Sequence, residues 1–514
     1  MLFAELVQVS AAMAATRSRL AKVEALAGLL RAAAAEPEGA AAVRVVAAYL
    51  VGVPLQGRLG TGWRTLIRLD VPPAEAPSLT AAGVDAALQS LAGTSGSGSR
   101  GRRAELLGAL LGAATAEEQG FLLRLLTGEL RQGALEGVML DAVARAAQAP
   151  GEQVRRAFML SGSLPDTAAA AVCGGAQALA AVGLRVGRPI RPMLASSAES
   201  LPAALAELGQ ASVEYKLDGA RIQVHRDGDQ VSVFTRTLRD ITASVPELVD
   251  LTRSLPCETV VLDGETLALT DEGRPRPFQE TMSRFGAASE RDLLLHPYFF
   301  DCLHLDGVDL LDAPLAQRHS ALRRVAGPYI IPGVHRPAAD EALDLLAASL
   351  SAGHEGVMVK ALDAPYAAGR RGRSWQKVKP SHTLDLVVLA AEWGHGRRTG
   401  YLSNLHLGAR DPDGGAPVMV GKTFKGLTDE LLAWQTARFP KLAVRRTDAA
   451  MYLRPELVVE IELDGVQVSP RYPGGVALRF ARVLRYRPDK GPEEADTIDA
   501  VRALLPQRDA PSAE

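Results

Sequence analysis

Residues Glu214 to Arg221 read EYKLDGAR, a polar motif in which a lysine precedes an aspartate by two residues and a glycine by three. Alone, a Lys-x-Asp-Gly tetrapeptide is weak evidence, because chance puts one into roughly 10% of chains of this length. Further short motifs follow it in order: TR at 235–236, DGE at 263–265, FFD at 299–301, EGVMVK at 355–360, WQKVK at 375–379, RFAR at 479–482 and DK at 489–490. The ordered set is therefore far more informative than its first member.

The chain around these motifs is long enough for several domains. Its 514 residues exceed the roughly 250 to 300 at which a single hydrophobic core stops growing. Alanine and leucine repeat at three-to-four spacing up to about Gly187, which predicts an all-α domain over residues 1–187. Short β-rich runs alternate with helical patterns over 188–380, which predicts an α+β domain.

The remaining residues predict a small β domain and a tail. Strand-like runs at 384–391, 405–410, 418–423, 458–463 and 478–486, with one helical pattern at 429–438, suit an OB-fold β-barrel over 381–507. Residues 508–514 read as a disordered tail. In the α+β part, residues 224–236 predict a hairpin that turns at Asp227-Gly228.

Two features of the helical part carry weaker expectations. The low-complexity stretch GTSGSGSRG at 93–101 predicts a flexible loop between two helical halves. The turns at 57–63 and 131–133 place glycines and arginines at helix starts. Such turns bind phosphate in some proteins and are ordinary helix caps in most.

Composition excludes several classes of protein. Hydrophobic residues at 47% and charged residues at 23% exclude a wholly disordered, collagen-like or coiled-coil chain. Three distant cysteines give no disulfide framework, no apolar run reaches the ~18 residues of a membrane span, and no signal peptide is visible, so we expect a cytoplasmic protein without a membrane partner. A net charge of −2 means that any nucleic-acid footprint is local.

One such local strip of charge lies at residues 370–379. It holds five cations in ten residues: Arg370, Arg371, Arg373, Lys377 and Lys379. Most charge runs are solvated faces. In a strand, however, alternation places Trp375, Lys377 and Lys379 on one side, which suits an anion bound in a cleft.

The ordered motif set resembles that of the covalent nucleotidyltransferases, which comprise DNA ligases, RNA ligases and mRNA capping enzymes. The resemblance implies that Lys216 is the nucleophile that takes up a nucleoside monophosphate. A lysine attacks phosphorus only as the neutral amine, a form favoured by neighbouring cations or a bound metal. The alternative, a solvated strand lysine, holds for most lysines.

The same resemblance assigns roles to the other motif residues. Glu214 marks adenine, Phe300 stacks on the base, and Glu265 and Glu355 bind metal, with Glu265 also near the ribose. Arg221 and Arg236 hold phosphate or ribose, and Arg371, Lys377 and Lys379 contact the nucleotide. The alternatives are that Phe300 is an ordinary core aromatic and that the arginines and glutamates are surface charges. Arg370 and Arg373 are neighbours of Arg371, and either could take the role assigned to it.

Near the C-terminus, residues 478–490 (LRFARVLRYRPDK) resemble the family motif that orients pyrophosphate. This implies roles for Arg479, Arg482, Asp489 and Lys490. The stretch departs from the common form at Ala481, where proline is usual. Residues 460–470 (EIELDGVQVSP) also resemble the barrel of ligases.

The helical part distinguishes ATP-dependent DNA ligases from other members of this superfamily. Residues 2–26, 126–143 (LTGELRQGALEGVMLDAV) and 192–195 resemble the DNA-binding domain of archaeal and eukaryotic-type ATP-dependent DNA ligases. NAD-dependent ligases usually carry a four-cysteine zinc finger, and only three cysteines exist here. The resemblance thus implies ATP and Mg²⁺, with Mn²⁺ as an alternative. It also implies nicked double-stranded DNA as partner, a monomer associated with the nucleoid, and a sliding clamp or repair proteins as further partners.

Two other functions remain open from the sequence. One is an RNA ligase or a capping-type nucleotidyltransferase on the same core. The other is a non-catalytic DNA-binding scaffold, against which the intact set of Lys216, Glu265, Glu355, Lys377 and Lys379 argues.

Overall fold

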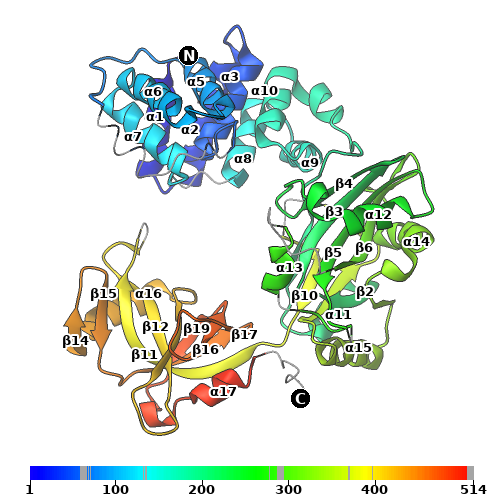
Figure 1. Ribbon diagram of the computed structural model, residues 1–514, viewed down its shortest axis with the longest axis vertical. Helices are drawn as coiled ribbons and strands as arrows, with labels where there is room; N and C mark the ends of the chain where they lie inside the picture. Colours follow the sequence, from blue (N-terminus) through cyan, green and yellow to red (C-terminus); the bar gives the residue numbers. More distant parts are fainter. Residues whose placement is uncertain are drawn as a thin grey trace.

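The computed structural model describes residues 1–57, 59, 66, 69, 71–130, 132, 136–271, 273–276, 278–285, 294–367, 371–395 and 398–505. A helical part, a part with two β-sheets and a second β-rich part follow one another along the chain (Figure 1). The tail predicted at 508–514, and all but one or two residues of the arginine-bearing turns at 57–63 and 131–133, lie outside the described residues.

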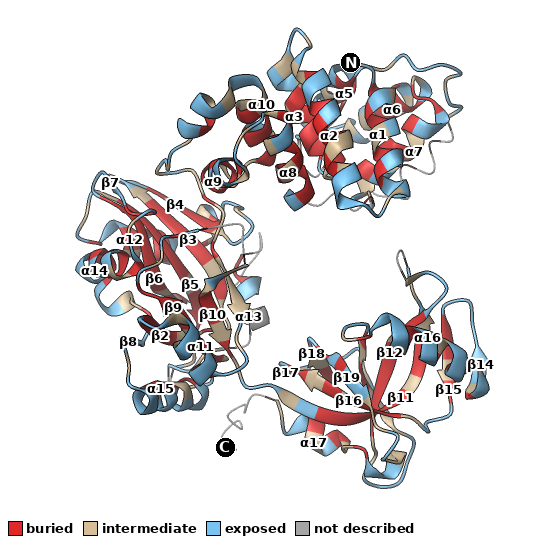
Figure 2. Cartoon of the chain, turned by 180° about the vertical axis from the view of Figure 1, so that it is seen from behind, coloured by how far each residue is buried: buried red, intermediate tan, exposed pale blue. Residues whose placement is uncertain are grey.

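The N-terminal part is helical, as the sequence predicted. Its described helices are α1 (Phe3–Ala15), α2 (Arg19–Ala34), α3 (Gly39–Leu50), α5 (Ala81–Gly93), α6 (Ser99–Gly112), α7 (Ala116–Thr127), α8 (Glu136–Ala146), α9 (Gly151–Ser161) and α10 (Leu164–Ala180). The apolar faces of these helices form one continuous core, shown red in Figure 2. Helix α7 begins at a capping box, in which Thr115 and Glu118 satisfy each other's backbone amides.

The loop predicted at 93–101 is shorter than expected. Helix α5 continues to Gly93 and α6 begins at Ser99, so only residues 94–98 connect them. The arginines that follow Ser99 favour helix over loop, and Arg103 donates hydrogen bonds to the carbonyl of Thr94, which holds the two helix ends together.

The middle part contains two five-stranded sheets. The first has the order β1 (Leu194–Ser197), β10 (Arg371–Val378), β9 (Gly356–Ala361), β2 (Ala211–Lys216), β8 (Gly333–His335). The second has the order β4 (Gln230–Thr235), β3 (Ala220–Asp227), β5 (Thr259–Ala268), β6 (Leu295–Leu305), β7 (Val308–Asp309). Helices α11 (Leu201–Leu208) and α15 (Ala339–Ser351) pack on the first sheet, and α12 (Pro246–Arg253), α13 (Phe278–Ser283) and α14 (Leu315–Ala326) on the second.

The EYKLDGAR motif crosses from one sheet to the other. Lys216 is the last residue of β2 in the first sheet, and Arg221 lies at the start of β3 in the second. The hairpin predicted at 224–236 is formed by β3 and β4, with Asp227 opposite Gln230 and Gly228 at a φ of 57° in the turn. The motif therefore lies where the edges of two sheets meet.

The C-terminal part is β-rich. Strands β11 (His382–Trp393), β12 (Leu402–Ala409), β13 (Val418–Thr423), β14 (Ala443–Arg446), β15 (Ala450–Leu453), β16 (Val458–Leu463) and β19 (Arg482–Tyr486) form one sheet, and β17 (Gly465–Val468) pairs with β18 (Val476–Arg479). The long strand β11 pairs with β12 and β15 near one end and with β16 near the other. Helices α16 (Asp429–Arg438) and α17 (Ile498–Arg502) complete this part.

The prediction of one strand over 478–486 was wrong. Phe480 has a φ of 56°, a conformation that breaks a strand, so the segment divides into β18 and β19. Strands β14, β15 and β17 were also missed, because each is only four residues long and gives little alternation to read. The helix predicted at 429–438 is confirmed by α16.

Contacts between side chains link the helical part to the two-sheet part. Met159 and Leu160 of α9 are buried in a cluster with Met193, Leu217 and other residues of the middle part. Both guanidinium Nη atoms of Arg156 donate to Asp312, each over 2.7 Å. Helix α9 therefore belongs to the helical part by sequence and also packs on the two-sheet part.

Within the described ranges, none of the helices combines the length and the apolar character needed to cross a membrane.

Candidate active site

Lys216 and Glu355 are held together by backbone and side-chain contacts. Lys216 pairs with Gly356 in the register between β2 and β9, and the Glu355 N–H donates to the Lys216 carbonyl over 2.9 Å. The Lys216 ammonium also donates a hydrogen bond to Glu355 Oε2. Gly356 is required beside them, because its φ is 134° and a Cβ atom would lie 2.3 Å from the Val378 carbonyl oxygen.

The carboxylate of Glu355 is surrounded by cations. Besides Lys216, Lys379 Nζ lies 3.4 Å and Arg479 Nη2 lies 3.7 Å from it. Burial alone raises the pKa of Glu355, but Lys216, Lys379 and Arg479 together hold that pKa below its ordinary value. Glu355 is therefore an anion at neutral pH.

Glu265 is the second carboxylate of the site. It lies opposite Arg221 in the pairing of β5 with β3, and its Oε1 accepts the Gly219 N–H over 3.1 Å. Burial raises the pKa of Glu265 to about 7, although Lys216 and Arg221 favour its charged form. A further cation placed beside such a carboxylate would stabilise its charged form.

Arg221 is fixed from three sides. Its guanidinium forms two hydrogen bonds with Asp263, of 3.0 and 2.6 Å, and donates a third to the Met193 carbonyl over 2.6 Å. The Tyr366 hydroxyl donates to Asp263 over 2.6 Å and accepts the Met193 N–H. These hydrogen bonds hold the Arg221 guanidinium rigidly, and Asp263 compensates much of its charge.

A cleft of about 960 Å³ brings the motif residues together. Among the predicted residues it is lined by Glu214, Lys216, Arg221, Arg236, Glu265, Phe300 and Lys377. Burial, with Lys379 and Lys216 nearby, lowers the pKa of Lys377. The buried indole N–H of Trp375, which also lines the cleft, has no hydrogen-bond partner among the described residues. A cleft with several cations and an unpaired donor is suited to a polyanionic ligand.

One end of the cleft is closed by aromatic and buried charged residues. Lys360 Nζ donates to Glu214 over 2.5 Å and lies 4.3 Å from the ring centre of Phe300 and 4.5 Å from that of Trp375. Phe300 and Trp375 meet edge to face at 5.9 Å. Phe300 is 7% exposed, so it is both a core residue and part of the cleft wall.

Among the described residues, one member of the C-terminal basic motif, Arg479, contacts Asp218 of the EYKLDGAR motif and Glu355. Arg479 forms hydrogen bonds of 2.9 and 3.3 Å with Asp218, besides its contact with Glu355. Lys379 is bonded over 2.7 Å to Asp464, which comes from the C-terminal part like Arg479. These bonds seat the C-terminal part against the EYKLDGAR motif.

The other members of that motif have different surroundings. Lys490 donates to Asp385 over 2.6 Å, Asp489 pairs with Arg487, and Arg482 is exposed. No contact with Lys216 or Glu355 is found for these three within the described part of the chain. Arg371 begins β10, but its side chain and all of Arg370 lie outside the described residues, so their roles stay predictions.

Several residues that touch the motif side chains were missed by the sequence reasoning. Asp263 and Lys360 stood inside quoted motifs, and both are buried charges with a partner in the site. Asp218 and Asp464 were also quoted without a role. Tyr366 and Met193 gave no local signal, because their contacts with Arg221 depend on residues far away in the sequence.

The donor set for a metal is small. Within the described residues, no group of three or more His, Cys, Asp and Glu side chains is placed to hold a metal ion. Glu265 and Glu355 nevertheless lie close enough that each charge acts on the other. Two carboxylates fit Mg²⁺, which is usually bound through one or two carboxylates, substrate phosphates and water.

Family models match three consecutive segments of the chain. The ATP dependent DNA ligase domain matches residues 192–379, the DNA ligase N terminus matches 64–144, and the ATP dependent DNA ligase C terminal region matches 398–490. These three matches follow the order of the parts seen in the structure.

Curated relatives match along almost the whole chain. The sequence is 68% identical to a protein of Rhodococcus jostii named "Probable DNA ligase", over 98% of this chain and all of that protein. Proteins of the same name from Nocardia farcinica and Mycobacterium marinum are 65% and 56% identical, each over 98% of this chain and all of the relative.

Two solved structures share the fold over nearly the full length. The structures titled "Pmar-Lig_Pre." and "Pmar-Lig_PreS3" have TM-scores of 0.61 and 0.60, identities of 17% and 18%, and cover 94% of this chain and 99% of their own. The three family matches and the full-length relatives show that this chain belongs to the ATP-dependent DNA ligase family.

Proposed function

We propose that this chain seals nicks in duplex DNA with ATP, through an intermediate in which AMP is bonded to Lys216. The observation that carries the proposal is the pairing of Lys216 with Glu355 in a cation-lined cleft, within a chain of the ATP-dependent DNA ligase family. Lys216 ends β2 at the crossing between the two sheets, is hydrogen-bonded to Glu355, and lowers the pKa of Glu265 by its charge.

In the first step, Lys216 Nζ attacks the α-phosphorus of ATP as a neutral amine. An N–P bond forms, the bond from that phosphorus to the bridging oxygen breaks, pyrophosphate leaves, and the attacking nitrogen releases one proton to solvent. Glu355 accepts the hydrogen bond of the amine and aims it, while the carbonyl of Lys216 stays fixed by the Glu355 N–H. The step needs little more than alignment and charge compensation.

Glu265 and Glu355 are the residues that would hold Mg²⁺, or Mn²⁺ in its place. When bound, the ion compensates phosphate charge and polarises the phosphorus that is attacked. The raised pKa of Glu265 supports this assignment. Burial destabilises the charged form of this carboxylate, so a bound cation would stabilise that form strongly.

The remaining cleft residues would bind the nucleotide. Phe300 would stack on the base and Glu214 would mark adenine at the closed end of the cleft. The cations Arg221, Arg236, Arg371, Lys377 and Lys379 would hold phosphate or ribose. The unpaired indole N–H of Trp375 supports a ligand at this wall.

The C-terminal part would act mainly in the first step. We propose that it is an OB-fold barrel, in line with the way β11 pairs with strands on both sides. Arg479, Arg482, Asp489 and Lys490 would orient pyrophosphate. Since Arg479 contacts Asp218 and Glu355 while no such contact is found for the other three among the described residues, those three would reach the pyrophosphate after a further movement of this part.

In the later steps, AMP passes to the 5′-phosphate of the nick and the 3′-hydroxyl then displaces it. The domains predicted at 1–187, 188–380 and 381–507 would close around the duplex, with the helical domain contacting the DNA backbone. Affinity should then fall steeply with salt and depend little on sequence. We further propose a monomer that works on the nucleoid in the cytoplasm and is recruited by a sliding clamp or repair proteins.

A nick-sealing assay tests this function. A fluorescent duplex with one 5′-phosphorylated nick should be joined with ATP and Mg²⁺, and far less with GTP or NAD. A nicked RNA duplex or GTP outperforming nicked DNA and ATP would favour an RNA ligase or capping-type enzyme. DNA binding without any joining would favour a non-catalytic scaffold.

A further inference from the structure

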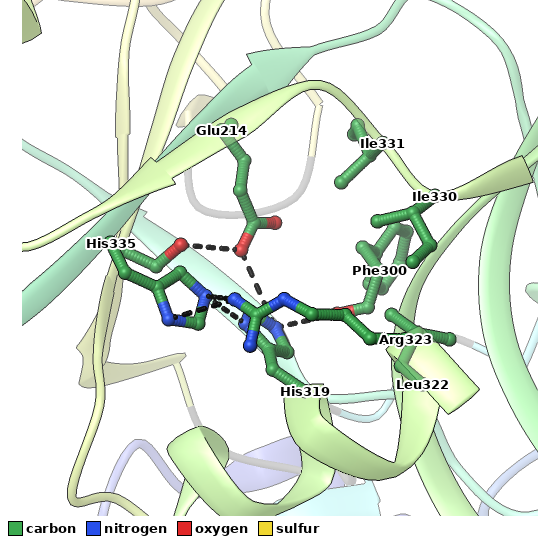
Figure 3. A pocket seen from close by; sticks show the side chains of 10 residues that line it. Glu214, Phe300, His319, Leu322, Arg323, Ile330, Ile331 and His335 are labelled. Atoms are coloured by element: carbon green, nitrogen blue, oxygen red, sulfur yellow. Dashed lines mark hydrogen bonds and ion pairs between the residues drawn. The ribbon is translucent and has the colours of Figure 1, made fainter. Parts of the chain in front are cut away.

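A chain of polar side chains lies behind the closed end of the cleft. It surrounds a cavity of about 70 Å³ between β2, β8 and α14, whose lining includes Glu214, Phe300, His319, Arg323 and His335 (Figure 3). Glu214, Phe300 and Ile331 also line the large cleft. They form the partition between the nucleotide cleft and the cavity behind it, and Glu214 and Phe300 are the two members that His319 contacts.

The Glu214 carboxylate is held by donors that approach from the cavity side and from β9. Ser212 donates to Oε1 over 2.9 Å, and His319 Nε2 lies 3.5 Å from the same oxygen. Lys360 donates to Oε2 over 2.5 Å. A buried carboxylate with these partners is ionised, and the pKa of Glu214 is lowered by Lys360 and by the Ser212 hydrogen bond against the effect of burial.

The hydrogen-bond chain fixes the tautomer of His319. Its Nε2 lies 3.1 Å from the Phe300 carbonyl oxygen, which can only accept, so Nε2 carries the proton. Burial lowers the pKa of His319, so the ring is neutral and Nδ1 is an acceptor. His335 Nε2, 2.7 Å away, then donates to it, and Arg323 Nη2 lies 3.0 Å from His335 Nδ1 and 2.9 Å from Nε2.

We propose that His319 is a positioning residue for base recognition, which fixes the Glu214 carboxylate and the Phe300 backbone so that the site accepts adenine and rejects guanine. An ionised carboxylate can accept a hydrogen bond from the exocyclic amino group of adenine. Guanine presents a carbonyl oxygen at the equivalent position, which the carboxylate repels. The inference rests on the proposed function, since it concerns the nucleotide used in that reaction.

His319 acts on both halves of the partition at once. Its single N–H lies between the Phe300 carbonyl and Glu214 Oε1, so removing the imidazole leaves a buried carbonyl without its donor and frees one carboxylate oxygen to turn. Lys216 and Glu355 lie outside this chain of contacts. The change should therefore weaken nucleotide binding and discrimination more than the chemical step.

The test is covalent labelling of the full chain from labelled ATP and GTP over a range of concentrations. His319→Leu should raise the KM for ATP by roughly 10-fold, leave the rate at saturating ATP within about 3-fold, and reduce the preference for ATP over GTP. His319→Gln, whose amide can still donate to the Phe300 carbonyl, should restore most of the affinity. A purely structural role would not produce a KM effect that the glutamine reverses.

Two further variants keep the test decisive. His304→Gln is the matched control, because His304 is another largely buried histidine of the same domain, bonded to Asp309 and Thr259 instead of to the partition. If His319→Leu does not fold, His335→Leu replaces it, since His335 is only partly buried and its loss removes the hydrogen bond that holds His319 Nδ1.

The outcomes separate this inference from the function on which it rests. Wild-type protein that takes no label from ATP would contradict the proposed function. Wild-type protein that labels normally, while His319→Leu or His335→Leu keeps the same KM and the same preference for ATP, would overturn the positioning role and leave the ligase function standing.

Discussion

Lys216 and Glu355 are paired twice, once through the backbone of adjacent strands and once through their side chains. The Glu355 N–H donates to the Lys216 carbonyl over 2.9 Å, and the Lys216 ammonium donates to the Glu355 carboxylate. Because 139 residues separate them in the sequence, the register of β2 with β9 is what places the proposed nucleophile beside a proposed metal ligand.

The charge of Glu355 should matter more for chemistry than for folding. Glu355→Gln keeps the size of the side chain and removes a negative charge that faces Lys216, Lys379 and Arg479. We expect the rate of lysine adenylylation to fall about 100-fold or more. The melting temperature should change little, because both partners of the Lys216 pair keep contact with water, at 19% and 18% side-chain exposure. Glu265→Gln should behave likewise, and a normal rate with either variant would remove its assignment as a metal ligand.

Arg479 should serve the step that uses ATP. Arg479→Ala removes its bonds to Asp218 and its contact with Glu355, so adenylylation should slow by roughly 10-fold or more. Sealing of a nick that already carries AMP should change much less. Arg485→Ala is the control, because Arg485 is exposed and pairs with Glu460 instead. Equal slowing of both steps would contradict a role in orienting pyrophosphate.

Arg482 offers a separate test of the same motif. It is exposed and lies outside the cleft in this arrangement of the domains. If the C-terminal part moves further during the first step, Arg482→Ala should also slow adenylylation more than the sealing of pre-adenylated DNA. An unchanged rate of adenylylation would show that Arg482 does not reach the pyrophosphate.

Gly219 should not tolerate a side chain. A Cβ atom there would lie 2.5 Å from Leu267 Cδ2, 2.6 Å from the Thr266 carbonyl oxygen and 2.9 Å from Glu265 Cγ. Gly219→Ala should therefore displace Glu265 and lower labelling of Lys216 by about 10-fold or more. Gly28→Ala, within α2 at a position where a Cβ atom would meet nothing within 4 Å, is the matched control and should label normally. Normal labelling of Gly219→Ala would show that a displacement of Glu265 does not slow the adenylylation of Lys216.

His225 should make the protein less stable in mild acid. The Gly187 N–H donates to Nδ1, and burial lowers the pKa of His225 to about 3, so the folded protein keeps this ring neutral. The unfolded chain takes up the proton below about pH 6.5. The free energy of unfolding should thus fall with pH in that range, by up to about 1.4 kcal/mol per unit from this group alone.

His225→Gln isolates that contribution. The variant should lose less stability than the wild type between pH 7.5 and pH 5.5, measured by urea unfolding at both values. The difference should be on the order of 1 kcal/mol, since only the lower unit of this range lies below pH 6.5. Equal losses in the two proteins would show that His225 is not held neutral.

Sequence reasoning succeeded where the signal is local. The helix at 429–438 and the hairpin at 224–236 each carry their periodicity and turn residues within a few positions, and the structure confirms both. The gathering of Lys216, Glu265 and Phe300 in one cleft followed from the order of the motifs and not from periodicity. What each of these residues does stays a prediction.

Contacts between residues that lie far apart in the sequence could not be predicted. The anchoring of Arg221 by Tyr366 spans 145 positions, and the bond from Lys360 to Glu214 spans 146, so no window of sequence contains either pair. The break at Phe480 depends on a single positive φ in a residue that normally favours strands. Each of these features is set by the packing of distant segments, which composition and spacing do not record.

Covalent labelling of Lys216 tests the central claim most directly. The full chain, Lys216→Ala and the surface control Lys441→Ala would be incubated with Mg²⁺ and ATP labelled at the α-phosphate, then separated on denaturing gels. We expect label on the wild type and on Lys441→Ala, none on Lys216→Ala, and release of the label on addition of nicked DNA. Label that persists in Lys216→Ala, or its absence from wild-type protein free of bound AMP, would contradict the account.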